Sequence, residues 1–74
     1  MGKIELPLRP NQEFIVLQSV LQVCDIISTG GIAKEFLATE KVLVNGERET
    51  RRGRKLYPGD LVKVLDAEIL IVEP

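Results

Sequence analysis

The sequence predicts an α+β domain in which two short helices pack against a small antiparallel sheet. Three observations predict this class: a helix-spaced apolar pattern from Leu17 to Cys24, a hairpin signal at Asn45-Gly46, and strand-like runs near both ends of the chain. At 74 residues the chain has room for one domain with a small core.

The first sixteen residues are predicted to form a strand that extends the domain at its N-terminus. Ile4, Leu6 and Leu8 alternate with polar residues or proline, which is the period of a half-buried strand. Pro7 cannot donate a backbone hydrogen bond, so this strand belongs at a sheet edge or ends there. A short extended piece is expected from Phe14 to Val16, after a turn.

Residues 17–64 are predicted to form the core motif, which begins with a pair of helices. The first helix carries its apolar residues at positions i, i+3, i+4 and i+7, namely Leu17, Val20, Leu21 and Cys24. Gly30 and Gly31 interrupt the pattern, because glycine destabilises a helix and adopts unusual backbone angles. A second helix is expected from Ile32 to Thr39. So short a connection requires the two helices to pack as a pair.

A β-hairpin is predicted after the helices. Asn45-Gly46 lies between strand-like runs at residues 42–44 and 47–50. A type I′ turn requires positive φ at both of its central residues, which asparagine and glycine tolerate. This dipeptide is therefore the strongest hairpin signal in the chain.

The remaining strands follow a second turn. Residues 57–60 suit a type II turn, with proline at the second position and glycine at the third. A strand is expected at residues 61–65. Residues 65–74 then supply a C-terminal strand, at Ile69–Val72.

The composition argues against an enzyme. The chain has no histidine, so neither a Ser-His-Asp nor a Cys-His arrangement can form, and it has no glycine-rich phosphate loop. We expect no cofactor and no metal ion. Cys24 is interpreted as a small buried hydrophobic residue in a reducing, cytoplasmic location. No apolar run suggests a signal peptide or a membrane segment.

Positive charge is concentrated in the middle of the chain. The net charge is −1, but residues 34–55 hold seven Lys or Arg against four Asp or Glu, whereas the remainder holds three against seven. Four of the cations fall within five residues, where Gly53 lets the backbone bend. These four are Arg51, Arg52, Arg54 and Lys55. A merely solvated loop is one interpretation, but no acidic residue interrupts the run between Thr50 and Tyr57, so we favour an anionic partner.

The aromatic residues limit the kind of anion. Phe14 and Phe36 are expected in the core, so a base-stacking platform with several exposed rings is not expected. Contacts to phosphates and to overall shape would then dominate. We therefore expect a monomeric protein whose partner is a structured RNA, either ribosomal RNA or a transfer RNA.

A second candidate site lies at the glycine pair. If Gly30 and Gly31 open the second helix, its free backbone N–H groups and its positive dipole end favour an anion, and Lys34 follows within one turn. The alternative is a plain turn with a surface lysine. Together with the basic run, the glycine pair would form a two-part phosphate-binding surface.

Three segments in order resemble the RNA-binding domain named after ribosomal protein S4. They are Ser28 to Lys34, Val42 to Glu47, and Arg51 to Leu56 with Gly59-Asp60. The resemblance covers about residues 17–64 and is strongest to the free-standing bacterial proteins of the YaaA and YbcJ type. It implies a helix pair on a small antiparallel sheet, a non-catalytic RNA-binding function, and the ribosome or a ribonucleoprotein as a candidate partner.

The resemblance also implies a set of RNA-facing positions. They are Ser28, Gly30, Gly31, Lys34, Asn45, Arg51, Arg52, Arg54 and Lys55. For Asn45 we favour a structural role, because the hairpin turn accounts for it. The chain departs from the family pattern at Val16, where many relatives have a hydroxyl residue at the start of the first helix. This departure leaves the start of that helix in question.

Two other functions stay open at this point. A protein-interaction adaptor would use the same basic residues to dock on an acidic protein surface. A ubiquitin-like sulfur carrier has a similar length, hairpin and Gly-Asp turn. Such a carrier needs a Gly-Gly C-terminus, whereas this sequence ends at Glu73-Pro74, so the ending argues against the carrier chemistry but not against the fold.

Overall fold

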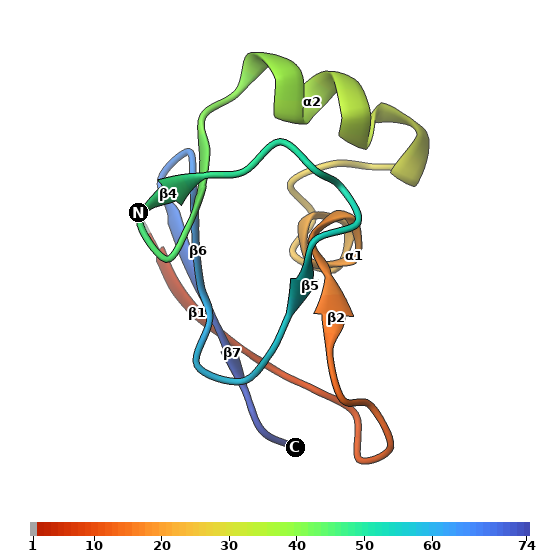
Figure 1. The fold of residues 1–74 in the computed structure, drawn as a ribbon, viewed down its shortest axis with the longest axis vertical. Helices are drawn as coiled ribbons and strands as arrows, with labels where there is room; N and C mark the ends of the chain where they lie inside the picture. The colour runs from red at the N-terminus through yellow and green to blue at the C-terminus, as the bar shows by residue number, and fades with distance from the viewer. Residues whose placement is uncertain (1) are drawn as a thin grey trace.

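In the computed structural model, which describes residues 2–74, two short helices lie beside a five-stranded sheet and a separate two-stranded sheet (Figure 1). The elements in chain order are β1 (Gly2–Pro7), β2 (Ile15–Val16), α1 (Leu17–Val23), the 3₁₀ helix η1 (Gly30–Ile32), α2 (Ala33–Thr39), β3 (Val42–Val44), β4 (Glu47–Arg48), β5 (Lys55–Leu56), β6 (Leu61–Val64) and β7 (Ala67–Val72). The fold belongs to the predicted α+β class.

The five-stranded sheet has the order β1-β7-β6-β3-β4, and three of its four pairings are antiparallel, as predicted. The exception is β1, which runs parallel to β7 with Gly2 opposite Ala67 and Pro7 opposite Val72. Short turns impose antiparallel pairing on β3–β4 and β6–β7. No short turn joins β1 to β7, so the sequence pattern does not specify their relative direction. As Pro7 predicts, β1 lies at the sheet edge.

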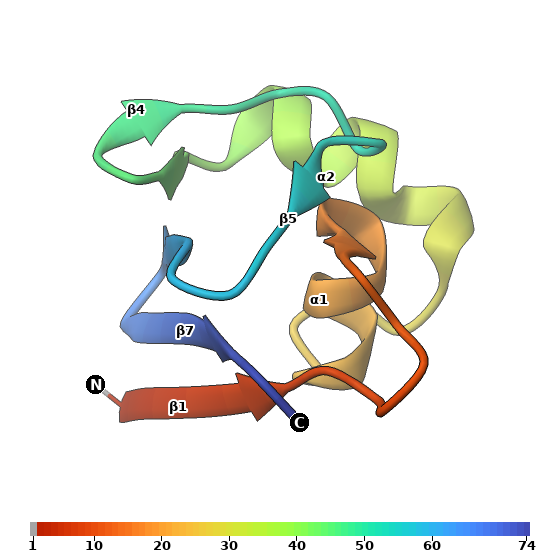
Figure 2. The same cartoon turned by 60° about the horizontal axis from the view of Figure 1, so that its bottom comes forward.

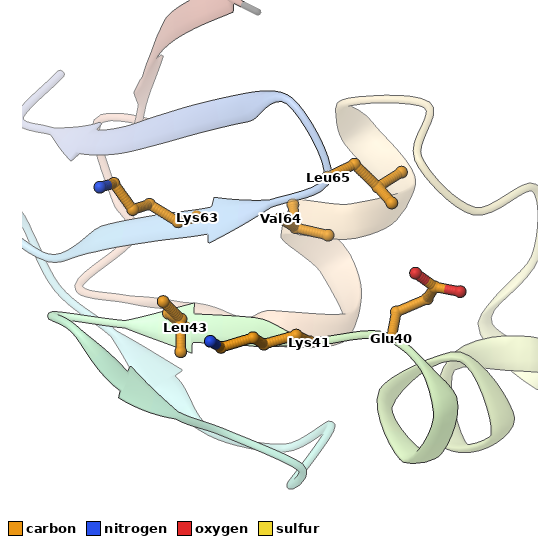
Figure 3. Close-up of a pocket in the computed structure, with 6 residues that line it drawn as sticks. All are labelled: Glu40, Lys41, Leu43, Lys63, Val64 and Leu65. Atoms are coloured by element: carbon orange, nitrogen blue, oxygen red, sulfur yellow. The ribbon is translucent and has the colours of Figure 1, made fainter.

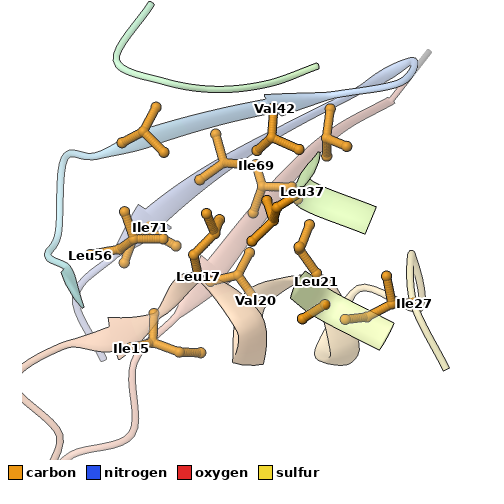
Figure 4. Packing of buried hydrophobic residues seen from close by; sticks show 14 of the residues in the cluster. Ile15, Leu17, Val20, Leu21, Ile27, Leu37, Val42, Leu56, Ile69 and Ile71 are labelled. Carbon is orange, nitrogen blue, oxygen red and sulfur yellow. The ribbon is translucent and has the colours of Figure 1, made fainter. Parts of the chain in front are cut away.

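Side chains from both helices and from one face of the sheet form the core (Figure 4). Leu17, Val20 and Leu21 of α1 are fully buried, which confirms the predicted apolar side of the first helix, and Leu37 of α2 packs with them. The strands contribute Val42, Val44, Val62, Val64, Ile69 and Ile71. Cys24 is half-buried against this core, and burial raises the pKa of its thiol.

Two turns have the backbone geometry that the sequence predicts. Asn45 and Gly46 have φ values of 53° and 86°, so both residues of the hairpin turn adopt the left-handed region. Gly59 has a φ of 100°, and the N–H of Asp60 donates to the carbonyl of Tyr57 at 2.9 Å, as in a type II turn. Turn chemistry therefore fixes the ends of β3, β4 and β6.

The strand β7 begins earlier than predicted, and the second α-helix begins one residue later than predicted. The strand β7 starts at Ala67 instead of Ile69, because Leu65 adopts a φ of 53° and closes a tight turn directly after β6. Leucine is not a residue that signals positive φ, which is why the sequence did not place the turn there. The second helix is preceded by the 3₁₀ turn at Gly30–Ile32, and its α-helical part begins at Ala33.

Candidate nucleic-acid interface

A buried carboxylate lies beneath residues 51–55, which we call the basic loop. Glu49 is only 6% exposed. Its carboxylate accepts hydrogen bonds from the backbone N–H, Nε and Nη2 of Arg51, at 3.0, 2.9 and 3.2 Å, and from Nη1 of Arg54 at 2.7 Å. Glu49 is absent from the predicted site residues. The hairpin register could have revealed it, because the N–H of Glu49 donates to the carbonyl of Val42 and the residue continues the pairing on the core face.

These hydrogen bonds keep Glu49 ionised. The side-chain hydrogen bonds from Arg51 are the main cause that lowers the pKa of Glu49 from its usual 4.5 to about 2; the backbone N–H of Arg51 and the Arg54 side chain act in the same direction, and burial opposes them. The carboxylate in turn raises the pKa of Arg51. Four cations and one carboxylate leave three net positive charges in residues 49–55. The basic loop is therefore less self-repulsive than its sequence suggests.

The basic loop also caps the first helix. The N–H groups of Leu17 and Gln18, in the first turn of α1, donate to the carbonyls of Arg54 and Arg52 at 2.9 and 3.0 Å. Val16, the N-cap residue, makes no side-chain hydrogen bond. Carbonyls of the loop thus satisfy helix N–H groups that a hydroxyl residue would otherwise serve, and the helix begins at the predicted position. The loop backbone is consequently fixed to α1 at two points.

The cations of the basic loop face solvent to different degrees. Arg52 and Lys55 are exposed, and neither forms an ion pair with any residue that the structure describes. The Arg51 side chain is 74% exposed and that of Arg54 is 33% exposed, although both contact Glu49. A shallow hollow is lined by Arg51, Gly53, Arg54 and Lys55. The loop thus presents positive charge to solvent, while hydrogen bonds to Glu49 and to α1 hold its backbone.

In the glycine turn, residues 28–34, Gly30 lies close to the end of the Gln18 side chain. Neither Gly30 nor Gly31 has a positive φ, so the expectation of unusual backbone angles at this pair is wrong. A Cβ at Gly30 would collide with the side-chain amide of Gln18 in α1. Ser28, Gly31 and Lys34 are exposed. The turn therefore lies tightly against α1 on one side and is open to solvent on the other.

Gln18 joins the two candidate sites. Its N–H donates to the carbonyl of Arg52, and its side chain lies against Gly30. Figures 1 and 2 both show the segment between β4 and β5 passing beside α1. The basic loop and the glycine turn therefore meet at the first turn of this helix. Contact between these residues and RNA stays a prediction.

Asn45 belongs to the hairpin turn between β3 and β4, and Figure 1 shows the turn before β4 apart from α1. Its Nδ2 donates to Oδ1 of Asp60 at 3.0 Å, and its Oδ1 accepts from the N–H of Leu61 at 3.0 Å. The side chain therefore ties the hairpin turn to the type II turn at residues 57–60. These contacts support the structural role that we favour for Asn45.

One phenylalanine is not where the sequence predicts. Phe36 packs against the core as expected. Phe14 is half-buried outside that cluster, with its ring centroid 5.8 Å from that of Tyr57 and with Nζ of Lys55 4.9 Å from its own centroid. The prediction that both phenylalanines belong to the core is therefore wrong for Phe14. An aromatic pair instead adjoins the basic loop.

A second hollow lies on the outer face of the five-stranded sheet (Figure 3). Its lining residues are Glu40, Lys41, Leu43, Lys63, Val64 and Leu65. Lys63 is exposed between the buried Val62 and Val64, so its side chain points away from the core. Within residues 2–74, no three His, Cys, Asp or Glu side chains are grouped so that they could hold a metal ion. In the same residues, every helix is too short or too polar to cross a membrane.

Comparison with known proteins identifies a family and a relative of this chain. The sequence profile described as "S4 domain" matches residues 8–72. The chain is 48% identical over 58 residues to a Bacillus subtilis (strain 168) protein named Probable ribosome maturation protein RlbA, and the match covers 78% of this chain and 82% of that protein. Both the basic loop and the glycine turn fall inside the range matched by the profile.

Proposed function

Since the chain belongs to the S4 domain family, we propose that it is a non-catalytic module that binds structured RNA through phosphate contacts. The observation that carries the proposal is the basic loop, which Glu49 and α1 hold in place while Arg52 and Lys55 face solvent. Phosphate contacts contribute affinity and orientation but little sequence information. A folded RNA whose backbone fits this surface is therefore the proposed ligand.

We take ribosomal RNA as the first RNA to test and transfer RNA as the second. The name of RlbA describes that protein as a probable ribosome maturation protein, and we extend a role of this kind to the present chain by analogy. In this proposal the protein acts as a cytoplasmic monomer on RNA or on a ribonucleoprotein. The competing function is an adaptor for an acidic protein surface, and an absence of RNA binding would favour it.

RNA binding is expected to be strongly salt-dependent. If about four phosphates are neutralised, the affinity falls about a hundredfold when the salt concentration is raised from about 50 to about 200 mM, because condensed counterions are released on binding. Fluorescence anisotropy with a labelled ribosomal RNA fragment measures this change. An affinity that does not respond to salt contradicts the proposal.

Lys34→Glu is expected to weaken RNA binding by about tenfold or more, since it reverses a charge in the glycine turn. Lys34 is exposed, so the thermal unfolding midpoint should change by only a few degrees. Lys41→Glu is the matched control, because it makes the same charge change at the outer hollow. Equal affinities for the two variants would mean that the glycine turn is a plain turn with a surface lysine.

A further inference from the structure

The aromatic pair of Phe14 and Tyr57 follows from the register of the two-stranded sheet. In the antiparallel pairing of β2 with β5, Ile15 lies opposite Leu56, and both side chains are buried. Continuing the register by one residue puts Phe14 opposite Tyr57. Because successive residues of a strand point to opposite faces, these two rings project outward from the core. The arrangement is therefore a cross-strand aromatic pair on the surface.

Lys55 connects this pair to the basic loop. It points to the same side of β5 as Tyr57, and its Nζ lies 4.9 Å from the ring centroid of Phe14. The two ring centroids are 5.8 Å apart, with the planes inclined at 50°, and Tyr57 is 48% exposed. Lys55 also lines the hollow of the basic loop. One cation thus borders both the aromatic pair and the group of arginines.

We propose that Tyr57, braced by Phe14, stacks on the base of an unpaired nucleotide whose neighbouring phosphates contact the basic loop. This inference rests on the proposed RNA-binding function and narrows its ligand to structured RNA with a bulged or otherwise unpaired nucleotide. Every base has a π face, so such a contact tolerates different bases. The phenol ring is amphipathic and half accessible, whereas Phe14 fixes its position from one side.

Tyrosine fluorescence offers a direct test. Tyr57 is the only tyrosine and the chain has no tryptophan, so its emission reports on this position alone. The probes are a blunt RNA duplex and the same duplex with a single bulged adenosine. We expect the bulged duplex to quench the emission and to bind about tenfold more tightly than the blunt one, since base stacking on an aromatic side chain contributes an effect of about this size.

Two variants separate stacking from a purely structural role of the ring. Tyr57→Leu should bind both duplexes equally, whereas Tyr57→Phe, which keeps the ring, should retain the preference for the bulged duplex. Circular dichroism melting checks that each variant is folded. If Tyr57→Leu does not fold, the wild-type emission and the Tyr57→Phe affinities still show whether Tyr57 stacks on the unpaired base.

The outcomes also separate this inference from the function on which it rests. Salt-dependent binding of both duplexes with equal affinity and without quenching overturns the stacking site and leaves the RNA-binding proposal intact. Absence of binding to either duplex at low salt overturns both.

Discussion

Glu49→Gln is expected to lower the free energy of unfolding by about 2 kcal/mol at neutral pH. The amide loses the charge that accepts hydrogen bonds from Arg51 and Arg54, and its NH₂ group faces their donors inside a nearly buried site. Because solvent surrounds the exposed Arg51 side chain, the ion pair between Arg51 and Glu49 contributes less to this loss of stability than a buried pair would. Urea unfolding followed by far-UV circular dichroism measures the difference. Glu47→Gln is the matched control, since Glu47 is exposed.

The stability difference between wild type and Glu49→Gln should also depend on pH. The pKa of Glu49 is lowered from 4.5 to about 2 in the folded protein, so the folded state holds the ionised form more strongly than the unfolded state does. Its contribution is therefore fully present above pH 4.5 and is lost as the pH falls from 4.5 towards 2. A difference that stays constant across this range would show that the carboxylate charge is not what stabilises the loop.

The double variant Arg52→Gln/Lys55→Gln is expected to lose about a hundredfold in RNA affinity at about 0.1 M salt, since each phosphate contact contributes about a factor of ten under these conditions. The slope of log affinity against log salt should also become shallower by about two. Both quantities come from anisotropy titrations at several salt concentrations. The matched control is Lys3→Gln/Lys41→Gln, which removes two exposed charges elsewhere on the surface.

The choice of these two cations follows from the contacts of Glu49. Neutralising Arg51 and Arg54 as well would leave a buried carboxylate without partners, so a loss of binding could then reflect unfolding. Arg52 and Lys55 have no such partner among the described residues. Unchanged affinity in the folded double variant would remove the basic loop as the binding surface.

Local chemistry explains which parts of the fold are predictable from the sequence. The hairpin depends on two adjacent residues that accept positive φ, Asn45 and Gly46, and the first helix depends on apolar spacing within eight residues. The parallel pairing of β1 with β7 depends on contacts between distant parts of the chain, which no local pattern encodes. Leu65 shows that prediction from local residue types can also fail, because a turn can close on a residue that rarely adopts positive φ.

The candidate site likewise has features that the sequence predicts and features that it does not. The basic loop is evident from its charges, whereas its anchor, Glu49, can be found only by extending the hairpin register beyond the two-residue strand β4 to the position opposite the buried Val42. Its residue type predicts Phe14 in the core, whereas its pairing with Tyr57 depends on a two-stranded sheet formed by residues far apart in sequence. Tertiary pairing, which composition does not reveal, decides both positions.

The pairing of β1 with β7 also has a consequence for the order of folding during translation. The strand β1 precedes the other strands of its sheet in the sequence and pairs only with β7, which follows them, so β1 must wait until β7 has been synthesised. The hairpin of β3 and β4 needs only neighbouring residues and can form earlier. Joining β1 to the sheet closes almost the whole chain into a loop, which makes it a late, entropically costly step.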